Sequence, residues 1–144
     1  MSIIYENLNP LPAARLLFQS SVALIAHELV GYLRITLEPG QHPSAELRAM
    51  FVESWRLHQA AGLHRVLFDQ RLAVPFSEAD KMWFIESFTP RLARQNAATR
   101  FAHLTATNVF ARLSMVPMAA GIYHQGDSYK SFEEEAAALQ WLLR

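Results

Sequence analysis

Histidine is the residue type in this sequence best suited to metal binding and proton transfer, but its six copies are dispersed. They are His27, His42, His58, His64, His103 and His124. No two of them have the HxH or HExxH spacing of metal ligands, and the chain has no cysteine to supply a thiolate. The spacing therefore predicts histidines scattered over surface and half-buried positions, and it predicts no metal site.

Serine and glycine, the residues of nucleophilic and phosphate-binding motifs, also lack the pattern that such chemistry needs. No serine lies in a G-x-S-x-G elbow. The turn before Ser77, where a helix is expected to begin, contains no glycine and is unsuited to holding a phosphate. We therefore expect no catalytic residues, no cofactor and no enzymatic activity.

The loop of residues 69–76 is unusually apolar for a loop. Leu72, Val74 and Phe76 surround Pro75, directly after an expected strand. Ligands of open α/β sheets bind beyond the carboxyl ends of parallel strands, and exposed apolar patches mark partner surfaces. The alternative interpretation is that these side chains cap the core. Candidate contact residues for a partner or ligand are Asp69, Leu72, Val74, Phe76, Ser77 and Trp83.

The elements that would position this loop begin with strands. Residues 15–19 and 22–28 are apolar runs separated by the Ser20-Ser21 turn. In residues 32–38, polar and apolar side chains alternate with period two, which predicts a strand with one buried face. These three segments predict an N-terminal β-ribbon.

From Pro43 onward the apolar period is helical. A helix is predicted from Pro43 to a stop at Gly62, with either His42 or Ser44 as its cap. The unbroken apolar run within residues 64–69 is typical of a strand buried on both faces, as in a parallel sheet.

The next helix is expected to begin at Ser77, because Ser77 and Asp80 have capping-box spacing. Pro90 should kink or restart this helix near Thr89. A further strand is predicted at residues 100–106.

A third helix should be capped by Thr107 or Asn108 and kinked or limited by Pro117. Its apolar stripe includes Val109, Phe110, Leu113 and Val116.

The C-terminal part is predicted to hold a loop, an edge strand and a helix. Residues 121–127 have the composition of a loop, and residues 129–131 that of a short edge strand. Ser131 and Glu134 have capping-box spacing. The stripe of the last helix consists of Phe132, Ala136, Leu139 and Leu143. Strands followed by alternating helices and strands predict a single α/β domain over residues 1–144, with a mixed, mostly parallel sheet and about four flanking helices.

Composition and charge limit the partners of such a domain. Hydrophobic residues make up 51% of the 144 residues and the net charge is zero. A neutral chain does not attract nucleic acid or anionic lipid over a distance, so we expect neither as a partner. We also expect no membrane insertion, because the apolar runs are short and interrupted. The absence of cysteine and of a secretory pattern in residues 1–7 favours a cytoplasmic location.

Three stretches resemble the STAS domain family, and most closely its SpoIIAA-like members, which are related in shape to Sec14-type lipid-binding folds. His64-Arg65-Val66-Leu67-Phe68-Asp69 resembles the central strand that ends in an acidic residue. Thr107-Asn108-Val109-Phe110-Ala111-Arg112 resembles the start of the helix after the next strand. Ser131-Phe132-Glu133-Glu134-Glu135-Ala136 with Leu139-Gln140-Trp141-Leu142 resembles the terminal F-x-x-E-E-A-x-x-W-L pattern, lengthened by one alanine.

The resemblance implies a regulatory domain that works by binding and not by catalysis. STAS-type antagonists carry a phosphorylated serine in an Asp-Ser-Gly-like segment after the central strand. Residues 69–77 match it only at Asp69 and at the expected helix cap Ser77, and the glycine is absent. The resemblance therefore carries over no phosphorylation switch.

Two functions follow as hypotheses. The first is a non-enzymatic protein-interaction domain that uses residues 69–77 and the helix they cap, with self-association possible. The second is a carrier or sensor of a small apolar, lipid-like ligand, which would need an enclosed cavity of a few hundred cubic ångströms near Trp55, Trp83 and Phe84.

Overall fold

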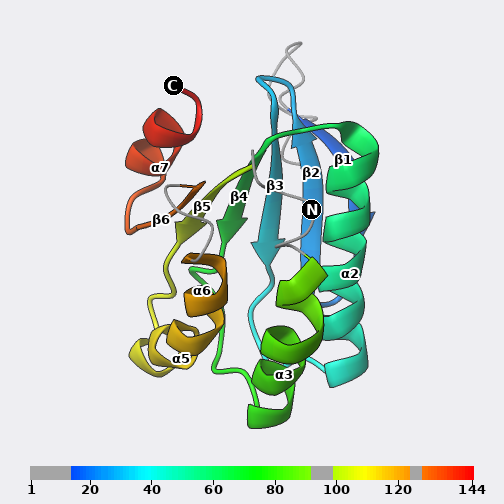
Figure 1. Ribbon diagram of the computed structural model, residues 1–144, viewed down its shortest axis with the longest axis vertical. Coiled ribbons are helices and arrows are strands. Elements are labelled where there is room, and N and C mark those ends of the chain that lie inside the picture. Colours follow the sequence, from blue (N-terminus) through cyan, green and yellow to red (C-terminus); the bar gives the residue numbers. More distant parts are fainter. Residues whose placement is uncertain (1–13, 92–98, 124–127) are drawn as a thin grey trace.

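A six-stranded mixed sheet forms the centre of the molecule (Figure 1). The computed structural model describes residues 14–91, 99–123 and 128–144. Strands β1 (Ala14–Gln19), β2 (Ala23–Glu28) and β3 (Tyr32–Leu37) form the predicted antiparallel ribbon. Strands β4 (Arg65–Asp69), β5 (Arg100–Leu104) and β6 (Tyr129–Phe132) follow in parallel. The α/β class and the mixed sheet predicted from the sequence are confirmed.

Helices cover both faces of this sheet (Figure 1). One face carries α2 (Ser44–Ala61), α3 (Glu78–Trp83), the π-helical turn η1 (Phe84–Phe88), α5 (Val109–Ser114) and α6 (Val116–Tyr123). The other face carries α7 (Glu135–Leu142), which packs on β4 and β5. Because successive side chains of a strand point to opposite faces, the two helical layers create two separate cores.

The larger core is aromatic and lies under α2, η1 and α6. Phe51 of α2 has its ring centre 4.9 Å from that of Phe84 and 5.8 Å from that of Phe68 on β4. The smaller core lies under α7, where Trp141 and Leu142 contact Leu67 of β4. Leu67 and Phe68, which are neighbours in β4, therefore pack in different cores.

The start of α2 differs from the prediction. The N-cap is Pro43, so neither His42 nor Ser44 caps the helix. The Ser44 hydroxyl instead donates to Asp80 Oδ2 at 3.1 Å, and this bond joins α2 to α3. The predicted stop is confirmed, since Gly62 adopts a left-handed φ of 66° and its N–H bonds to the carbonyl of Gln59.

The helix is interrupted and restarts near Thr89, as the proline predicted. The interruption is the π-helical turn η1, in which the N–H of Thr89 bonds to the carbonyl of Phe84, and α-helical geometry resumes at Thr89. Pro90 has no N–H to donate and its ring would collide with the carbonyl of Glu86 in a regular helix. The wider turn absorbs this conflict, and the chain remains helical through residue 91.

Pro117 separates α5 from α6, as predicted, and lies in the first turn of α6, where its missing N–H is harmless. The predicted loop at residues 121–127 is wrong in its first part, because residues 121–123 belong to α6. Residues 124–127 lie outside the described residues.

The predicted cap of the last helix is also wrong. Ser131 lies in β6, where it pairs with His103 of β5, and Glu134 is the N-cap of α7. Strand pairing therefore extends through Phe132, and the helix begins later than its capping-box spacing indicated. The buried face of α7 shifts accordingly to Ala138, Trp141 and Leu142, whereas Leu139 and Leu143 are only half-buried.

Candidate functional site

Asp69 ends β4 in a buried network of charges. Arg71 donates to both of its carboxylate oxygens, at 3.0 and 2.8 Å, and Arg34 of β3 lies 3.8 Å away. Burial alone would raise the pKa of Asp69, but the hydrogen bonds and charge of Arg71 outweigh it and hold this pKa below its usual value. Asp69 is therefore ionised and already occupied by partners within the chain.

The same network reaches the start of α7. Glu135 accepts from Arg34 at 2.6 Å and from Arg71 at 3.0 Å, and Arg34 also lies 3.3 Å from Glu28 of β2. These ion pairs hold α7 and the loop after β4 against the sheet. The structure thus assigns Asp69 to internal cross-linking of elements and not to a free surface.

The apolar residues of the 69–76 loop divide between the two interpretations. Phe76 is buried, and its ring centre lies 6.3 Å from that of Phe51, so it caps the core. Val74 is half-buried. Leu72 is 56% exposed, and Val74 with Ser77 lines a cleft of about 260 Å³ at the start of α3.

The two remaining candidates are positioned by α3. Ser77 caps the helix, because its Oγ accepts from the N–H of Asp80 at 3.1 Å. Trp83 is half-buried, stacks on Phe88, and lies 5.6 Å below the guanidinium of Arg48. Trp83 therefore closes the aromatic core near α2.

The most exposed apolar surface lies on α5 and the start of α6. Val109, Phe110, Leu113 and Val116 are 52, 70, 62 and 61% exposed. We call these four residues the outer stripe. The sequence singled them out as the apolar stripe of the helix, but Ala111, Met115 and Met118 are the residues that face the core. The helix has apolar residues on both faces, and the periodicity did not distinguish the buried face from the exposed one.

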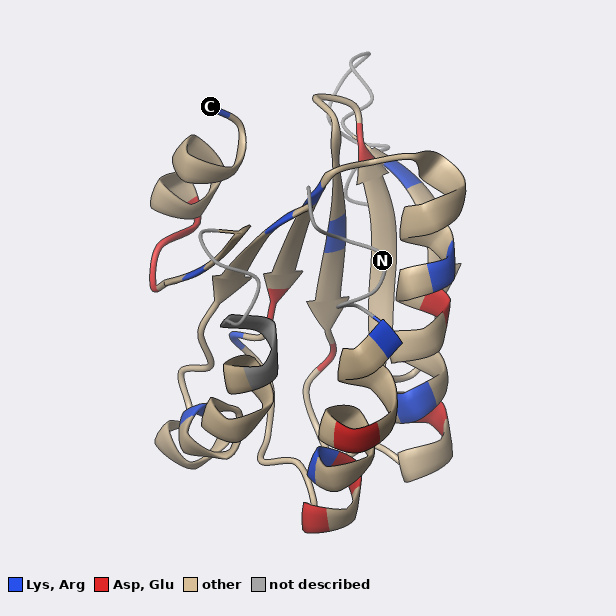
Figure 2. Cartoon of the chain, in the orientation of Figure 1, with Lys and Arg blue, Asp and Glu red and all other residues tan. Residues whose placement is uncertain are grey.

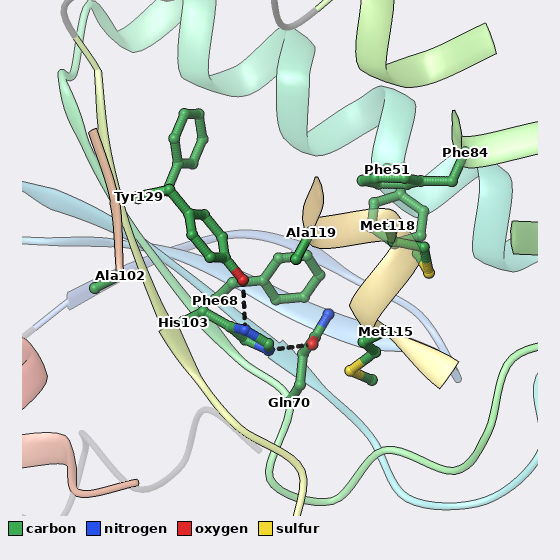
Figure 3. Close-up of a pocket in the computed structure, with 11 residues that line it drawn as sticks. Phe51, Phe68, Gln70, Phe84, Ala102, His103, Met115, Met118, Ala119 and Tyr129 are labelled. Carbon is green, nitrogen blue, oxygen red and sulfur yellow. Dashed lines mark hydrogen bonds between the residues drawn. The ribbon is translucent and has the colours of Figure 1, made fainter. Parts of the chain in front are cut away.

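A polar cluster lies inside the sheet-to-helix space at the carboxyl ends of β4 and β5 (Figure 3). The side-chain Oε1 of Gln70 accepts from Nε2 of His103, and Nδ1 of His103 accepts from the Tyr129 hydroxyl at 2.7 Å. Burial lowers the pKa of His103 to about 4, although the charge of Asp69 acts in the opposite direction. The imidazole is therefore neutral at pH 7. No sequence motif marked this cluster, because its members come from three separate segments.

Cavities lie beside this cluster and within the aromatic core. Two apolar hollows of about 50 Å³ each lie between the sheet and the helices, and Phe51, Phe68, Phe84 and Phe101 line both. The hollow beside Trp55 and Phe84 is thus far smaller than the cavity expected for a lipid carrier. A wider cleft of about 190 Å³ opens beside His103, between the ends of β5 and β6 and the helices α5 and α6.

The described residues hold no group of three His, Asp or Glu side chains arranged to bind a metal ion. None of the helices in the described ranges has the length and apolar character needed to cross a bilayer. The chain matches no protein-family model, and no curated protein or solved structure matches it either.

Proposed function

We propose that this chain is a non-enzymatic, cytoplasmic protein-interaction domain of regulatory type, and that it associates through the outer stripe of α5 and α6. The observation that carries this proposal is the exposure of four large apolar side chains within eight residues. Single exposed apolar residues are ordinary, but a contiguous group of them marks an interaction surface. The resemblance to SpoIIAA-like STAS domains supports the same class of function.

The presence of apolar residues on both faces of α5 and α6 supports the proposed association further. A surface helix normally has one apolar face, and a helix that is apolar on all sides is normally buried. The inner face of α5 and α6 already packs on the core through Ala111, Met115 and Met118. The outer stripe therefore has the character of a second buried face whose covering is supplied by another molecule.

The loop predicted from the sequence contributes to this surface at one end. Both the N–H and the hydroxyl of Thr107, just before α5, bond to the carbonyl of Arg71, at 3.1 and 2.9 Å. These bonds bring Leu72, which follows Arg71, beside the first turn of α5. Leu72 thus extends the outer stripe, and Phe76 is joined to α5 because its N–H donates to Ser114 Oγ at 3.4 Å.

A second copy of the chain is the occupant that we propose for this surface. The net charge is zero, so two copies do not repel each other, and no member of the stripe is charged. Val109 and Leu113 lie one turn apart on α5, and Val116 begins α6. Two copies of this surface would face each other about a twofold axis, as an isologous contact requires.

Sedimentation analysis of the wild type and of Phe110→Glu and Leu113→Glu variants tests the proposal. The wild type is expected to form a dimer whose population rises with concentration, and each variant is expected to be monomeric. Both positions are well exposed, so the fold should survive with a change in stability within about 0.5 kcal/mol.

Val30→Glu is the matched control. Val30 is 67% exposed and lies in the turn between β2 and β3, at the opposite end of the sheet from α5 (Figure 1). This variant should dimerise like the wild type. A wild type that is monomeric at every concentration, or a control that dissociates as much as the stripe variants, overturns the proposal.

A further inference from the structure

The cleft beside His103 has the location and the chemistry of a small-molecule site, and it adjoins the outer stripe at Val116. It lies where β5 and β6 end, the position at which open α/β sheets bind ligands. Its polar lining comes from His103 and Thr105 at the end of β5, from Tyr129 and Ser131 of β6, and from Arg112 of α5. Its opposite wall is apolar and comes from Met115, Val116 and Ala119.

Arg112 provides the one positive charge of this lining. Its Nε donates to the carbonyl of Ala106 at 3.0 Å, which fixes the guanidinium at the rim of the cleft. In contrast to Arg34, Arg48 and Arg71, it forms no ion pair with any carboxylate of the described residues. A guanidinium held by one nitrogen presents its remaining N–H groups as a fork that matches a carboxylate.

The other polar groups of the lining are neutral. His103 is an uncharged imidazole at pH 7, with both nitrogens hydrogen-bonded. The hydroxyl of Ser131 lies 3.4 Å from Nδ1 of His103, and that of Thr105 lies 3.4 Å from the carbonyl of Phe132. One guanidinium among neutral groups complements a single negative charge.

The deeper wall of the cleft leads toward the aromatic core. His103, Met115, Ala119 and Tyr129 line both the cleft and the inner hollow next to it, where Phe68 and Phe84 follow (Figure 3). Methionine side chains change rotamer readily and adapt to an inserted group. The cleft volume of about 190 Å³ compares with the roughly 150 Å³ of an engineered protein cavity that holds benzene.

From this arrangement we propose that the cleft binds a small organic monocarboxylate, with the carboxylate on Arg112 and an aromatic ring or short alkyl chain directed between Met115, Ala119 and Tyr129. The site adds ligand sensing or carriage to the domain, and Arg112, which would hold the carboxylate, is not a member of the outer stripe. The ligand is much smaller than a membrane lipid.

Calorimetric and NMR titrations with benzoate and hexanoate, each beside its neutral amide, test the proposal on the folded wild-type protein. The carboxylates are expected to bind at least about tenfold more tightly than the amides, because a charge-assisted pair with Arg112 is lost in the amides. Arg112→Gln should weaken carboxylate binding about tenfold, and Arg112→Lys should lose less.

Two further variants make the result specific. Ala119→Phe places a ring in the cleft and should abolish binding while circular dichroism still reports a folded protein. Arg15→Gln removes an exposed arginine of β1, at the other edge of the sheet, and should leave binding unchanged.

Three results would overturn the proposed site. They are equal binding of acid and amide, an equal loss of carboxylate binding in Arg112→Gln and Arg15→Gln, and the absence of any chemical-shift change near His103 at saturating probe. Sedimentation of Arg112→Gln separates this outcome from the association proposal, because Arg112 is not a member of the outer stripe.

Discussion

Ser77 and Asp80 show how two side chains start one helix and join it to another. The Oγ of Ser77 accepts from the N–H of Asp80, which is the half of the capping box predicted from the sequence. The carboxylate of Asp80 does not complete the box. It accepts from Ser44 and from Arg48 of α2, both at 3.1 Å, and thereby fastens α3 to α2.

Replacing Ser77 tests its role as a cap. Ser77→Ala should lower the free energy of unfolding by about 1 kcal/mol, because one N–H of the first turn loses its acceptor. Ser77→Asp should be almost neutral, since aspartate also caps and its charge favours the positive end of the helix. Urea denaturation measures both values. An alanine variant as stable as the wild type, together with an aspartate variant that no longer self-associates, would instead indicate a phosphorylation switch.

His103 makes stability depend on pH in a defined direction. Its pKa is about 4 in the folded chain and near 6.5 in the unfolded chain, so between these pH values the unfolded state binds a proton that the folded state excludes. The contribution of the neutral, buried His103 to the free energy of unfolding is fully present above pH 6.5 and is lost as the pH falls toward 4. It amounts to at most about 3 kcal/mol.

Denaturation of the wild type and of His103→Asn across this pH range checks the prediction. The variant should show a clearly shallower loss of stability from pH 6.5 to 4. A residual slope is expected, because burial also lowers the pKa of His58. Parallel slopes for the two proteins would contradict the neutral, buried state of His103.

At the scale of elements, α7 is part of the core through a different face from the one predicted. Leu142 and Ala138 are fully buried against Leu67 and Leu104, while Leu139 is half-buried. Trp141 and Leu142, the W-L pair of the terminal pattern, thus indicate the buried face better than helical periodicity does. The predicted apolar stripe of the last helix began too early, since Phe132 belongs to β6.

Truncation of two leucines in α7 distinguishes these faces. Leu142→Ala should cost about 2–5 kcal/mol, as for other fully buried large-to-small changes. Leu139→Ala should cost clearly less, because part of its surface is already in water. Chemical denaturation provides both values, and a larger loss for Leu139 would place the helix in the orientation that the sequence pattern predicted.

At the scale of the whole molecule, charge and apolar surface are distributed unequally. Figure 2 shows charged residues along α2, α3 and the sheet, whereas the exposed outer stripe of α5 and α6 is apolar. With zero net charge, association has no long-range electrostatic contribution in either direction. The contact that we propose is therefore driven by burial of apolar surface.

Salt provides the test at this scale. Raising the ionic strength from about 0.1 to about 1 M shortens the Debye length from about 10 to about 3 Å. The dissociation constant of the dimer should stay the same or fall, because apolar contacts are not screened. Sedimentation equilibrium at the two salt concentrations measures it, and a dimer that dissociates in high salt would show that ion pairs, not the outer stripe, hold it together.

Local patterns in the sequence were sufficient for the order of elements and for several of their ends. Alternation with period two at residues 32–38 required a strand with one face in the core, and Gly62 supplied the left-handed stop of α2. Ser77 caps its helix with a side-chain oxygen, as predicted, and Asn108 is the one of the two candidates Thr107 and Asn108 that caps α5. Each of these features depends on atoms within a few residues, so the sequence by itself determined it or reduced it to two residues.

Contacts between distant segments decided the rest. Ser131 lies in a strand because it pairs with His103. Ser44 does not cap α2, and its hydroxyl donates to Asp80 instead. The candidate site arose in the same way, since Gln70, His103 and Tyr129 meet only because β4, β5 and β6 lie side by side. The segment of α5 and α6 has apolar residues on two faces. Only packing of Ala111, Met115 and Met118 in the core selected the inner face and left Phe110 in solvent.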